Sequence, residues 1–334
     1  MRTGINPAKL DSQLSVQYHH RIVIPVFIPE LSGYFENLKE VYRLCIETAF
    51  KSQHSRSAIT VVDNGSCEEV KAWLRELQDR GIIETLITHQ SNIGKIDAII
   101  GAARGSREPL ITLSDSDILF RNGWQEEVES VFRSFPKSGA VAPFPIARHM
   151  YYHSSSTQKA VVTGDMKFSF RETDEHELIR EVYESYGWNY EPAYDGVLPV
   201  VQKNGKEAVM GCGHQVFTIR RELFFDMPLS PSFIKIGAGS ELNWIDKPIN
   251  ELGFWRLSTL KTYVHHMGNQ LTEENKAAFE EVVKNESTPN LLALPQTEVN
   301  KMNLWEHRFF SKIFKLKNDF RPPAPELTVQ FKSL

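Results

Sequence analysis

The chain has 334 residues, of which 41% are hydrophobic and 24% are charged, and this composition argues against a disordered, collagen-like or disulfide-stapled chain. At roughly 150 residues per domain, the length predicts about two domains. The net charge of −4 does not indicate a nucleic-acid-binding surface, and three cysteines far apart, with no Cys-x-x-Cys pair, do not indicate a cysteine-rich zinc site.

The sequence shows no targeting or membrane-spanning segment. Residues 1–20 lack the apolar core of a secretory signal. The longest apolar run, 22–28, is much shorter than the roughly 20 residues that a membrane-spanning helix needs. We therefore expect a cytoplasmic protein whose membrane contact, where there is any, is peripheral at the inner face.

The N-terminal part alternates strand-like and helix-like segments. Residues 21–28 (RIVIPVFI) are almost continuously apolar, as strands buried on both faces of a parallel sheet tend to be. Similar patterns predict strands at 58–62, 82–88 and 109–113, and helices at 34–50, 67–80 and 94–104. This alternation is typical of a parallel α/β sheet.

The composition changes near residue 140, where an aromatic-, Ser- and Thr-rich segment begins. Beyond it the patterns predict a loop at 187–206, strands at 209–219 and 260–265, and helices at 174–186, 220–226, 241–252 and 272–284. We expect one α/β half at 1–140, a second half of the same domain at 141–270, and a helical C-terminal extension at 271–334.

The extension contains a basic amphipathic helix at 304–317. Its apolar face is formed by Trp305, Phe309, Ile313 and Leu316. The basic residues between them are Arg308, Lys312 and Lys315. Such a helix fits peripheral contact with a membrane. It fits equally well packing against the rest of the chain or against a second subunit.

The strongest chemical signal is an acidic pair after the fourth predicted strand, Asp115 and Asp117 in LITLSDSD. Ligands of parallel α/β sheets bind beyond the carboxyl ends of the strands, and Mg²⁺ or Mn²⁺ is held by one or two carboxylates together with substrate phosphates. The pair therefore suggests a site for a metal-bound diphosphate, although a solvated Asp/Ser turn would read the same way.

Two neighbouring strand ends carry ligand-competent residues as well. Asp63 follows the second strand and could accept hydrogen bonds from a base or ribose, or simply form an Asp-Asn-Gly turn. Asn92, Gly94 and Lys95 open the next helix, where the helix N-terminus and a lysine would attract phosphate. Neither a P-loop nor a GxGxxG motif is present, which disfavours ATPases and simple dehydrogenases.

Four segments, in this order and spacing, resemble the nucleotide-sugar-binding half of the family 2 glycosyltransferases of GT-A fold: IPVFIPE (24–30), ITVVDNGS (59–66), NIGKIDAI (92–99) and LITLSDSD (110–117). The acceptor-side half of the family is resembled more loosely by GCGHQVFTIRREL (211–223), by the acidic helix 241–253 and by VHHMG (264–268). The resemblance implies an α/β fold of GT-A type, with a mixed, mainly parallel sheet flanked by helices.

The resemblance also implies roles for individual residues. The nucleotide-sugar site would be formed by Pro25, Phe27, Asp63, Asn92, Gly94, Lys95, Ser114 and Asp115. A Mn²⁺ or Mg²⁺ ion would be held by Asp117 of the DXD motif and by His266, while His265 would point the other way along its strand.

The acidic helix departs from the family pattern. It usually begins Glu-Asp, with the aspartate as catalytic base, but here reads Ser240-Glu241-Leu242. We therefore expect Glu241 to be the base and Asp246 to be the reserve, while a helix-N-terminal carboxylate without a catalytic role remains an alternative for Glu241.

Several other residues have structural and functional interpretations side by side. His214 and Cys212 lie at a Gly-flanked strand end and could contact an acceptor, although a packed strand is the simpler account. Aromatic residues that could stack on a sugar, or belong to the core, are Tyr151, Tyr152, Trp188, Tyr190 and Tyr194.

Together with the resemblance, which implies inversion at the anomeric carbon, these features predict a metal-dependent hexosyl- or hexosaminyltransferase. It would move a sugar from a nucleoside-diphosphate sugar to a hydroxyl of a saccharide or lipid-linked acceptor, in the synthesis of a cell-envelope polysaccharide or glycoconjugate. The alternatives are a catalytically inactive nucleotide-sugar-binding module, a scaffold that docks through the basic helix, and a sugar nucleotidyltransferase. The last would need a Gly- and Arg-rich loop after the first strand, and IPVFIPELSG contains no arginine.

Overall fold

The N-terminal strands form the parallel part of a ten-stranded sheet, in the order β3-β2-β1-β4. The computed structural model describes residues 4–9, 14–289, 294–295 and 297–318. The four strands are β1 (His20–Val26), β2 (Ser57–Asn64), β3 (Thr85–His89) and β4 (Leu110–Ser114). Every residue of β1, β2 and β4 is buried, which is why these segments are near-continuously apolar.

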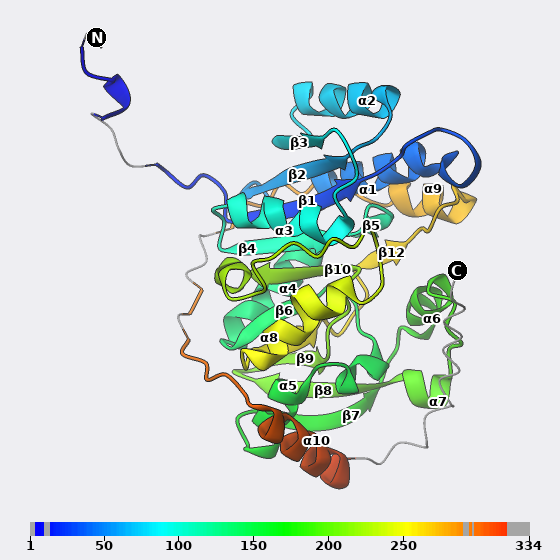
Figure 1. The fold of residues 1–334 in the computed structure, drawn as a ribbon. Helices are drawn as coiled ribbons and strands as arrows, with labels where there is room; N and C mark the ends of the chain where they lie inside the picture. The colour runs from blue at the N-terminus through cyan, green and yellow to red at the C-terminus, as the bar shows by residue number, and fades with distance from the viewer. Residues whose placement is uncertain (1–3, 10–13, 290–293, 296, 319–334) are drawn as a thin grey trace.

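The sheet continues beyond β4 in the order β10-β6-β11-β9-β8-β7, with mostly antiparallel neighbours (Figure 1). These strands are β6 (Ser138–Ala142), β7 (Lys167–Glu172), β8 (Val197–Lys203), β9 (Lys206–Met210), β10 (Val216–Arg220) and β11 (Trp255–Ser258). The predicted α/β class with a mixed sheet is confirmed. The sheet runs without a break across residue 140, and the proposed division into halves there stays a prediction.

Helices flank the sheet. Those of the N-terminal part are α1 (Leu38–Ser52), α2 (Glu68–Asp79), α3 (Lys95–Gly105) and α4 (Trp124–Ser134). Later in the chain come α5 (Ser155–Val162), α6 (His176–Ser185), α7 (Pro192–Asp195), α8 (Lys247–Glu251), α9 (Glu273–Glu280) and α10 (Leu304–Asn318). A π-helical turn, Leu242–Asp246, leads directly into α8.

The predicted elements of the second half need correction. The loop expected at 187–206 contains α7 and β8, and the strand expected at 209–219 is two strands, β9 and β10. The break falls at Gly211, which has a φ of +109° and lies so close to the backbone of His149 that a Cβ would approach within 2.6 Å. Residues 221–225 form a 3₁₀ turn instead of a regular helix. The strand expected at 260–265 is the shorter β12 (Val264–His266).

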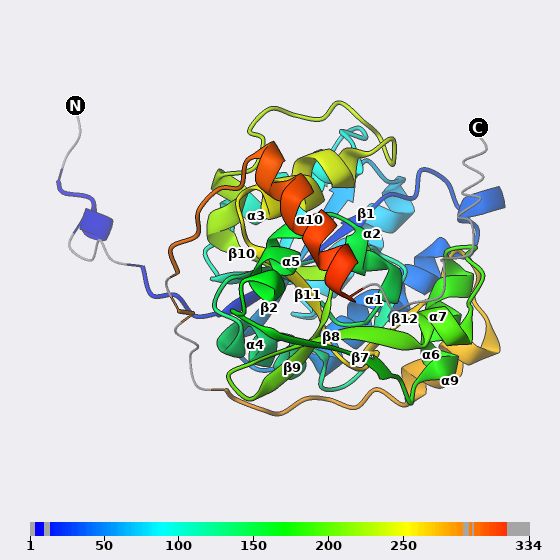
Figure 2. The same ribbon diagram turned by 90° about the horizontal axis from the view of Figure 1, so that it is seen from below.

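The helix α10 packs at the β7 end of the sheet and crosses α5 (Figure 2). It is anchored by Phe314, which is fully buried and contacts the rings of Tyr151 and Phe168. Of the apolar face predicted for this helix, Trp305, Phe309 and Leu316 are exposed, so the helix is anchored through Phe314 and not through these residues. Residues 319–334, which belong to the predicted extension, lie outside the described residues.

A buried polar network ties the amino end of β1 to α4. His20 Nδ1 and His54 Nε2 lie 3.0 and 2.9 Å from Glu129 Oε1. These three side chains are close enough to share a metal ion. However, the Arg56 N–H donates to His54 Nδ1, so the proton of a neutral His54 is on Nε2 and is donated to Glu129. The cluster is therefore accounted for as a buried hydrogen-bond network.

This end of the molecule should lose stability in mild acid. Burial lowers the pKa of His19 to about 4 and also lowers the pKa of His20. The stability that depends on neutral histidines is therefore present above about pH 6.5 and is lost as the pH falls toward the folded-state values. We expect the thermal unfolding midpoint to fall by a few degrees between pH 7 and pH 4.5, and to fall less in His19→Gln. An equal pH dependence in the two proteins would contradict this explanation.

Candidate active site

A cavity of about 440 Å³ opens at the carboxyl ends of the parallel strands. Six of the residues predicted for the site line it: Pro25, Phe27, Asn92, Lys95, Asp115 and Asp117. They come from β1, from the start of α3 and from the turn after β4, which the parallel register of the strands brings to one edge. The structure thus brings most of the predicted site residues together.

A second part of the cavity lining, which is mostly aromatic, was not predicted as part of the site. It is formed by Tyr34, Phe35, Leu38 and Tyr42, from the short segment after β1 and the first turns of α1. The rings of Phe27 and Phe35 pack edge to face, with centroids 6.1 Å apart. The signal in the sequence was Gly33-Tyr34-Phe35 soon after the first strand, since aromatic residues at a strand end can line a ligand cavity.

The predicted metal ligands meet through a second, two-stranded sheet. β12 pairs antiparallel with β5 (Ile118–Phe120), which places His266 opposite Ile118. As a result His266 Nε2 lies 3.4 Å from Asp117 Oδ2. His265 turns the other way, toward Asn275 and Glu181, so the predicted alternation is confirmed.

The chemistry of this pair fits a divalent cation. Two ligands of one such ion, at about 2.1 Å from it, lie roughly 3 Å apart. Asp117 Oδ1 is buried without a hydrogen-bond partner among the described residues. Burial raises the pKa of Asp117 to about 6, against the opposing effect of His266. A cation would compensate the buried charge and use the unpaired oxygen.

Lys95 connects the acidic turn to the π-helical turn. Its Nζ lies 2.5 Å from Asp115 Oδ1 and 3.2 Å from Glu241 Oε1. Burial alone would lower the pKa of Lys95, but the two carboxylates outweigh it and raise that pKa. Burial would likewise raise the pKa of Glu241, yet the charge of Lys95 and the hydrogen bonds that Glu241 accepts leave it lowered. Lys95 is therefore a fixed cation beside Asp115.

Three predicted nucleotide-site residues lie elsewhere. Asp63 is fully buried in β2, where its Oδ1 accepts from the Ser66 N–H and its Oδ2 has no partner in the described part of the chain. The neighbouring Asn64 lines the cavity in its place. Ser114 is buried at the end of β4. Gly94, with a φ of +98°, faces a second cavity instead.

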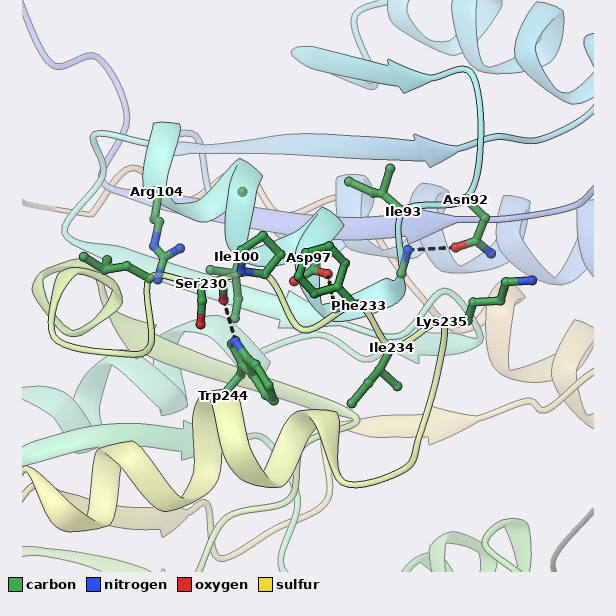
Figure 3. Close-up of a pocket in the computed structure, with 14 residues that line it drawn as sticks. Asn92, Ile93, Asp97, Ile100, Arg104, Ser230, Phe233, Ile234, Lys235 and Trp244 are labelled. Atoms are coloured by element: carbon green, nitrogen blue, oxygen red, sulfur yellow. Dashed lines mark hydrogen bonds between the residues drawn. The ribbon is translucent and has the colours of Figure 1, made fainter.

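That second cavity, of about 560 Å³, lies between α3 and the loop 229–235 (Figure 3). The loop is held down by Asp97, whose carboxylate accepts from Ser232 and from the Phe233 N–H. Trp244 closes the other side and donates to the Ser230 carbonyl. Its polar groups are thus used to fix the loop, and the cavity adjoins the first one at Asn92 and Lys235.

Asp246, the reserve base of the sequence analysis, is the centre of a buried network. Its Oδ1 accepts from Arg256 at 2.6 Å, and its Oδ2 accepts from Tyr152 at 2.9 Å and from His214 at 3.0 Å. Burial would raise the pKa of Asp246, but Arg256 and His214 leave it lowered. Both oxygens are therefore already engaged, and Asp246 is not free to take a proton from an acceptor.

The remaining residues of interest are mainly structural. Of the five predicted aromatic residues, Tyr152 reaches this network, while Trp188 packs against Tyr183 and Tyr186. Cys212 is fully buried, and its carbonyl accepts from Arg256. The simpler, structural interpretation therefore holds for Cys212 and Trp188.

Comparison with known proteins identifies the segment that carries most of this site. The family model described as Glycosyl transferase family 2 matches residues 31–187. Residues 31–187 belong to glycosyl transferase family 2. The predicted family is confirmed over these residues. No curated protein matches the sequence at a significant level.

Solved structures match this chain at low similarity. S. aureus TarS 1-349 is 11% identical, with 73% of this chain and 59% of TarS 1-349 covered and a TM-score of 0.39. The mannosyltransferase PcManGT from Pyrobaculum calidifontis, in complex with GDP-Man and Mn²⁺, is 13% identical, with 76% of this chain and 60% of PcManGT covered and a TM-score of 0.41. Glucosyl-3-phosphoglycerate synthase from Mycobacterium tuberculosis, in complex with Mn²⁺, UDP and glucosyl-3-phosphoglycerate, is 13% identical, with 84% of this chain and 83% of the synthase covered and a TM-score of 0.41. The chain thus spans about three fifths of the first two.

Proposed function

We propose that this family 2 chain is a metal-dependent glycosyltransferase. It moves a sugar from a nucleoside-diphosphate sugar to a hydroxyl of a saccharide or lipid-linked acceptor, with inversion at the anomeric carbon. The observation that carries the proposal is the approach of His266 to Asp117, 3.4 Å apart, where Asp117 lines a cavity that also has aromatic rings in its lining. A cation site beside an aromatic cleft suits a diphosphate joined to a flat base.

The donor is bound by the residues that line the cavity. The base and ribose lie against the aromatic part of the lining and Phe27, where a ring face can stack. Asn64 and Asn92 offer amide groups to the nucleoside, and Asn92 Oδ1 already accepts from the Gly94 N–H at the start of α3. Lys95 supplies a positive charge to the diphosphate. Asp63 is fully buried and does not line the cavity, so we assign its predicted place at the base to Asn64.

Asp117 and His266 would hold Mn²⁺ or Mg²⁺, with Asp115 close by. When bound, the ion supplies Lewis-acid neutralisation of the departing diphosphate. Around it, Lys95 orients the diphosphate from the side of α3, and Glu241 keeps Lys95 directed toward Asp115. Glu241 is the predicted base, but its lowered pKa makes this carboxylate a weaker proton acceptor than an ordinary glutamate.

Peripheral membrane contact through α10 is part of the proposal, in line with a lipid-linked acceptor and a role in cell-envelope synthesis. The exposed rings of Trp305 and Phe309 are stacked, with centroids 4.6 Å apart, and Arg308 and Lys312 are exposed beside them. Aromatic and basic side chains together suit an anionic lipid surface. Within the described residues, no helix is long and apolar enough to cross a membrane.

A thermal-shift screen tests this function. A ligand that binds the folded state raises the unfolding midpoint, so one of UDP-glucose, UDP-N-acetylglucosamine and GDP-mannose should raise it with Mn²⁺ and raise it less with EDTA. Release of nucleoside diphosphate on adding an acceptor then separates a transferase from an inactive binding module. Stabilisation by none of these donors, with or without Mn²⁺, would contradict the proposal.

A further inference from the structure

One histidine outside the predicted machinery is held like a catalytic base. His214 lies in the short segment between β9 and β10, and its Nδ1 is 3.0 Å from Asp246 Oδ2. A carboxylate accepts hydrogen bonds, so the Nδ1 of His214 is the donor. The neutral imidazole then carries its lone pair on Nε2. The side chain of His214 is 31% exposed, so it is accessible to a ligand.

Asp246 is a rigid support for this imidazole. Its side chain is 1% exposed and is fixed by the Arg256 guanidinium and by the Tyr152 hydroxyl. Arg256 is in turn held by the carbonyls of Cys212 and Tyr152. A buried carboxylate that orients an imidazole through Nδ1 fixes both its tautomer and its direction.

The imidazole lies beside the donor site. The carbonyl of the next residue, Gln215, accepts from the Asp115 N–H at 2.7 Å, which ties the segment of His214 to the acidic turn after β4. The charges of both Glu241 and Lys95 act on His214. His214 therefore sits between the turn that would hold the diphosphate and the π-helical turn at 242–246.

We propose that His214, oriented by Asp246, is the general base that activates the acceptor hydroxyl. The proposal rests on the proposed function. The acceptor oxygen bonds to the anomeric carbon and passes its proton to His214 Nε2. The bond between that carbon and the diphosphate oxygen breaks, and its electron pair leaves on the diphosphate. Asp246 is a positioning residue for His214, and Glu241 holds Lys95 in place through their ion pair.

The charged groups around His214 set its pH dependence. Burial lowers its pKa, but the hydrogen bond and charge of Asp246, with the charge of Glu241, outweigh burial and leave the pKa raised, while Lys95 opposes them. Also near His214 are the Tyr152 ring and the buried His149, whose pKa is lowered by burial to about 3, while Arg256 binds the other oxygen of Asp246. A base acts in its deprotonated form, so turnover should rise with pH through the pKa of His214.

The kinetic test uses release of nucleoside diphosphate from UDP-glucose, UDP-N-acetylglucosamine or GDP-mannose with Mn²⁺. His214→Asn keeps an N–H donor for Asp246 but has no base, and should lower turnover by about 10²- to 10⁴-fold with unchanged donor binding. It should also lose the acid limb of the wild-type pH profile. His176→Asn is the control, because His176 lies on α6 and hydrogen bonds to Tyr190. This variant should leave the turnover and its pH profile unchanged.

The outcomes are distinct. Wild-type turnover and an unchanged acid limb of the pH profile in His214→Asn would overturn the assignment of His214 as the base. A large loss of turnover in Glu241→Gln alone would return the role of base to Glu241. If the wild-type chain neither binds nor turns over any of these donors, the proposed function falls and the base falls with it.

A spectroscopic test needs no substrate. Long-range ¹H–¹⁵N spectra of the full chain, assigned with His214→Asn, should show His214 protonated on Nδ1 when neutral. Asp246→Asn should lower the pKa of His214. If Asp246→Asn fails to fold, Tyr152→Phe replaces it as the test, because it keeps the Asp246 carboxylate and its His214 should retain the proton on Nδ1. A neutral His214 with its proton on Nε2 in the wild-type chain would overturn the arrangement.

Discussion

Asp117→Ala is expected to lower release of nucleoside diphosphate by about 10³-fold or more, since a cation that neutralises a leaving group contributes several kcal/mol to the transition state. The variant removes one of the two side chains of the proposed cation site. It should stay folded, because burial already disfavours the charged form of Asp117, whose pKa is raised to about 6. Turnover and the unfolding midpoint with Mn²⁺ are the measurements.

A matched variant makes this result specific. Asp174→Ala removes an exposed aspartate ahead of α6, and should change neither turnover nor the Mn²⁺-dependent shift of the midpoint. Turnover that survives in Asp117→Ala, or a loss of Mn²⁺ stabilisation in Asp174→Ala, would contradict the metal assignment. His266→Ala should reproduce the Asp117→Ala result, because the two side chains would share the ion.

The parallel half of the fold was predictable because its signals are local. β1, β2 and β4 are buried along their whole length, so each one appears in the sequence as an apolar run. Parallel strands all end at one edge, and Asp115, Asn92 and Lys95 follow those ends directly. Knowing the strand ends was therefore enough to bring these residues together.

The second half was less predictable because its buried groups are polar. Ser155 and Ser156 lie buried in α5, where they hydrogen bond to Asn250 and to the Phe254 carbonyl, far along the chain. A pattern of apolar residues cannot reveal a helix whose core face is made of serines with distant partners. The strand β7 was missed too, since its side chains are mostly exposed at the edge of the sheet.

The chemistry of the site was predictable only in part for the same reason. Asp117 and His266 could be named from motifs. The ion pairs of Lys95 with Glu241 and of Arg256 with Asp246 could not, because they join segments that are distant in the sequence. These contacts change which groups can accept a proton. The sequence therefore located the cleft, and the packing of α8 and β11 decided the availability of its carboxylates.

Arg256→Met should be the most destabilising single change considered, at about 3 to 5 kcal/mol of unfolding free energy, because it leaves a buried carboxylate without its partner. Arg256 is fully buried and donates to Asp246 at 2.6 Å and to the Cys212 carbonyl at 2.7 Å. Arg171→Met removes an exposed pair with Glu207 and should cost less than about 1 kcal/mol. Chemical denaturation of both variants measures the difference, and equal losses would show that the Asp246 network carries no special share of stability.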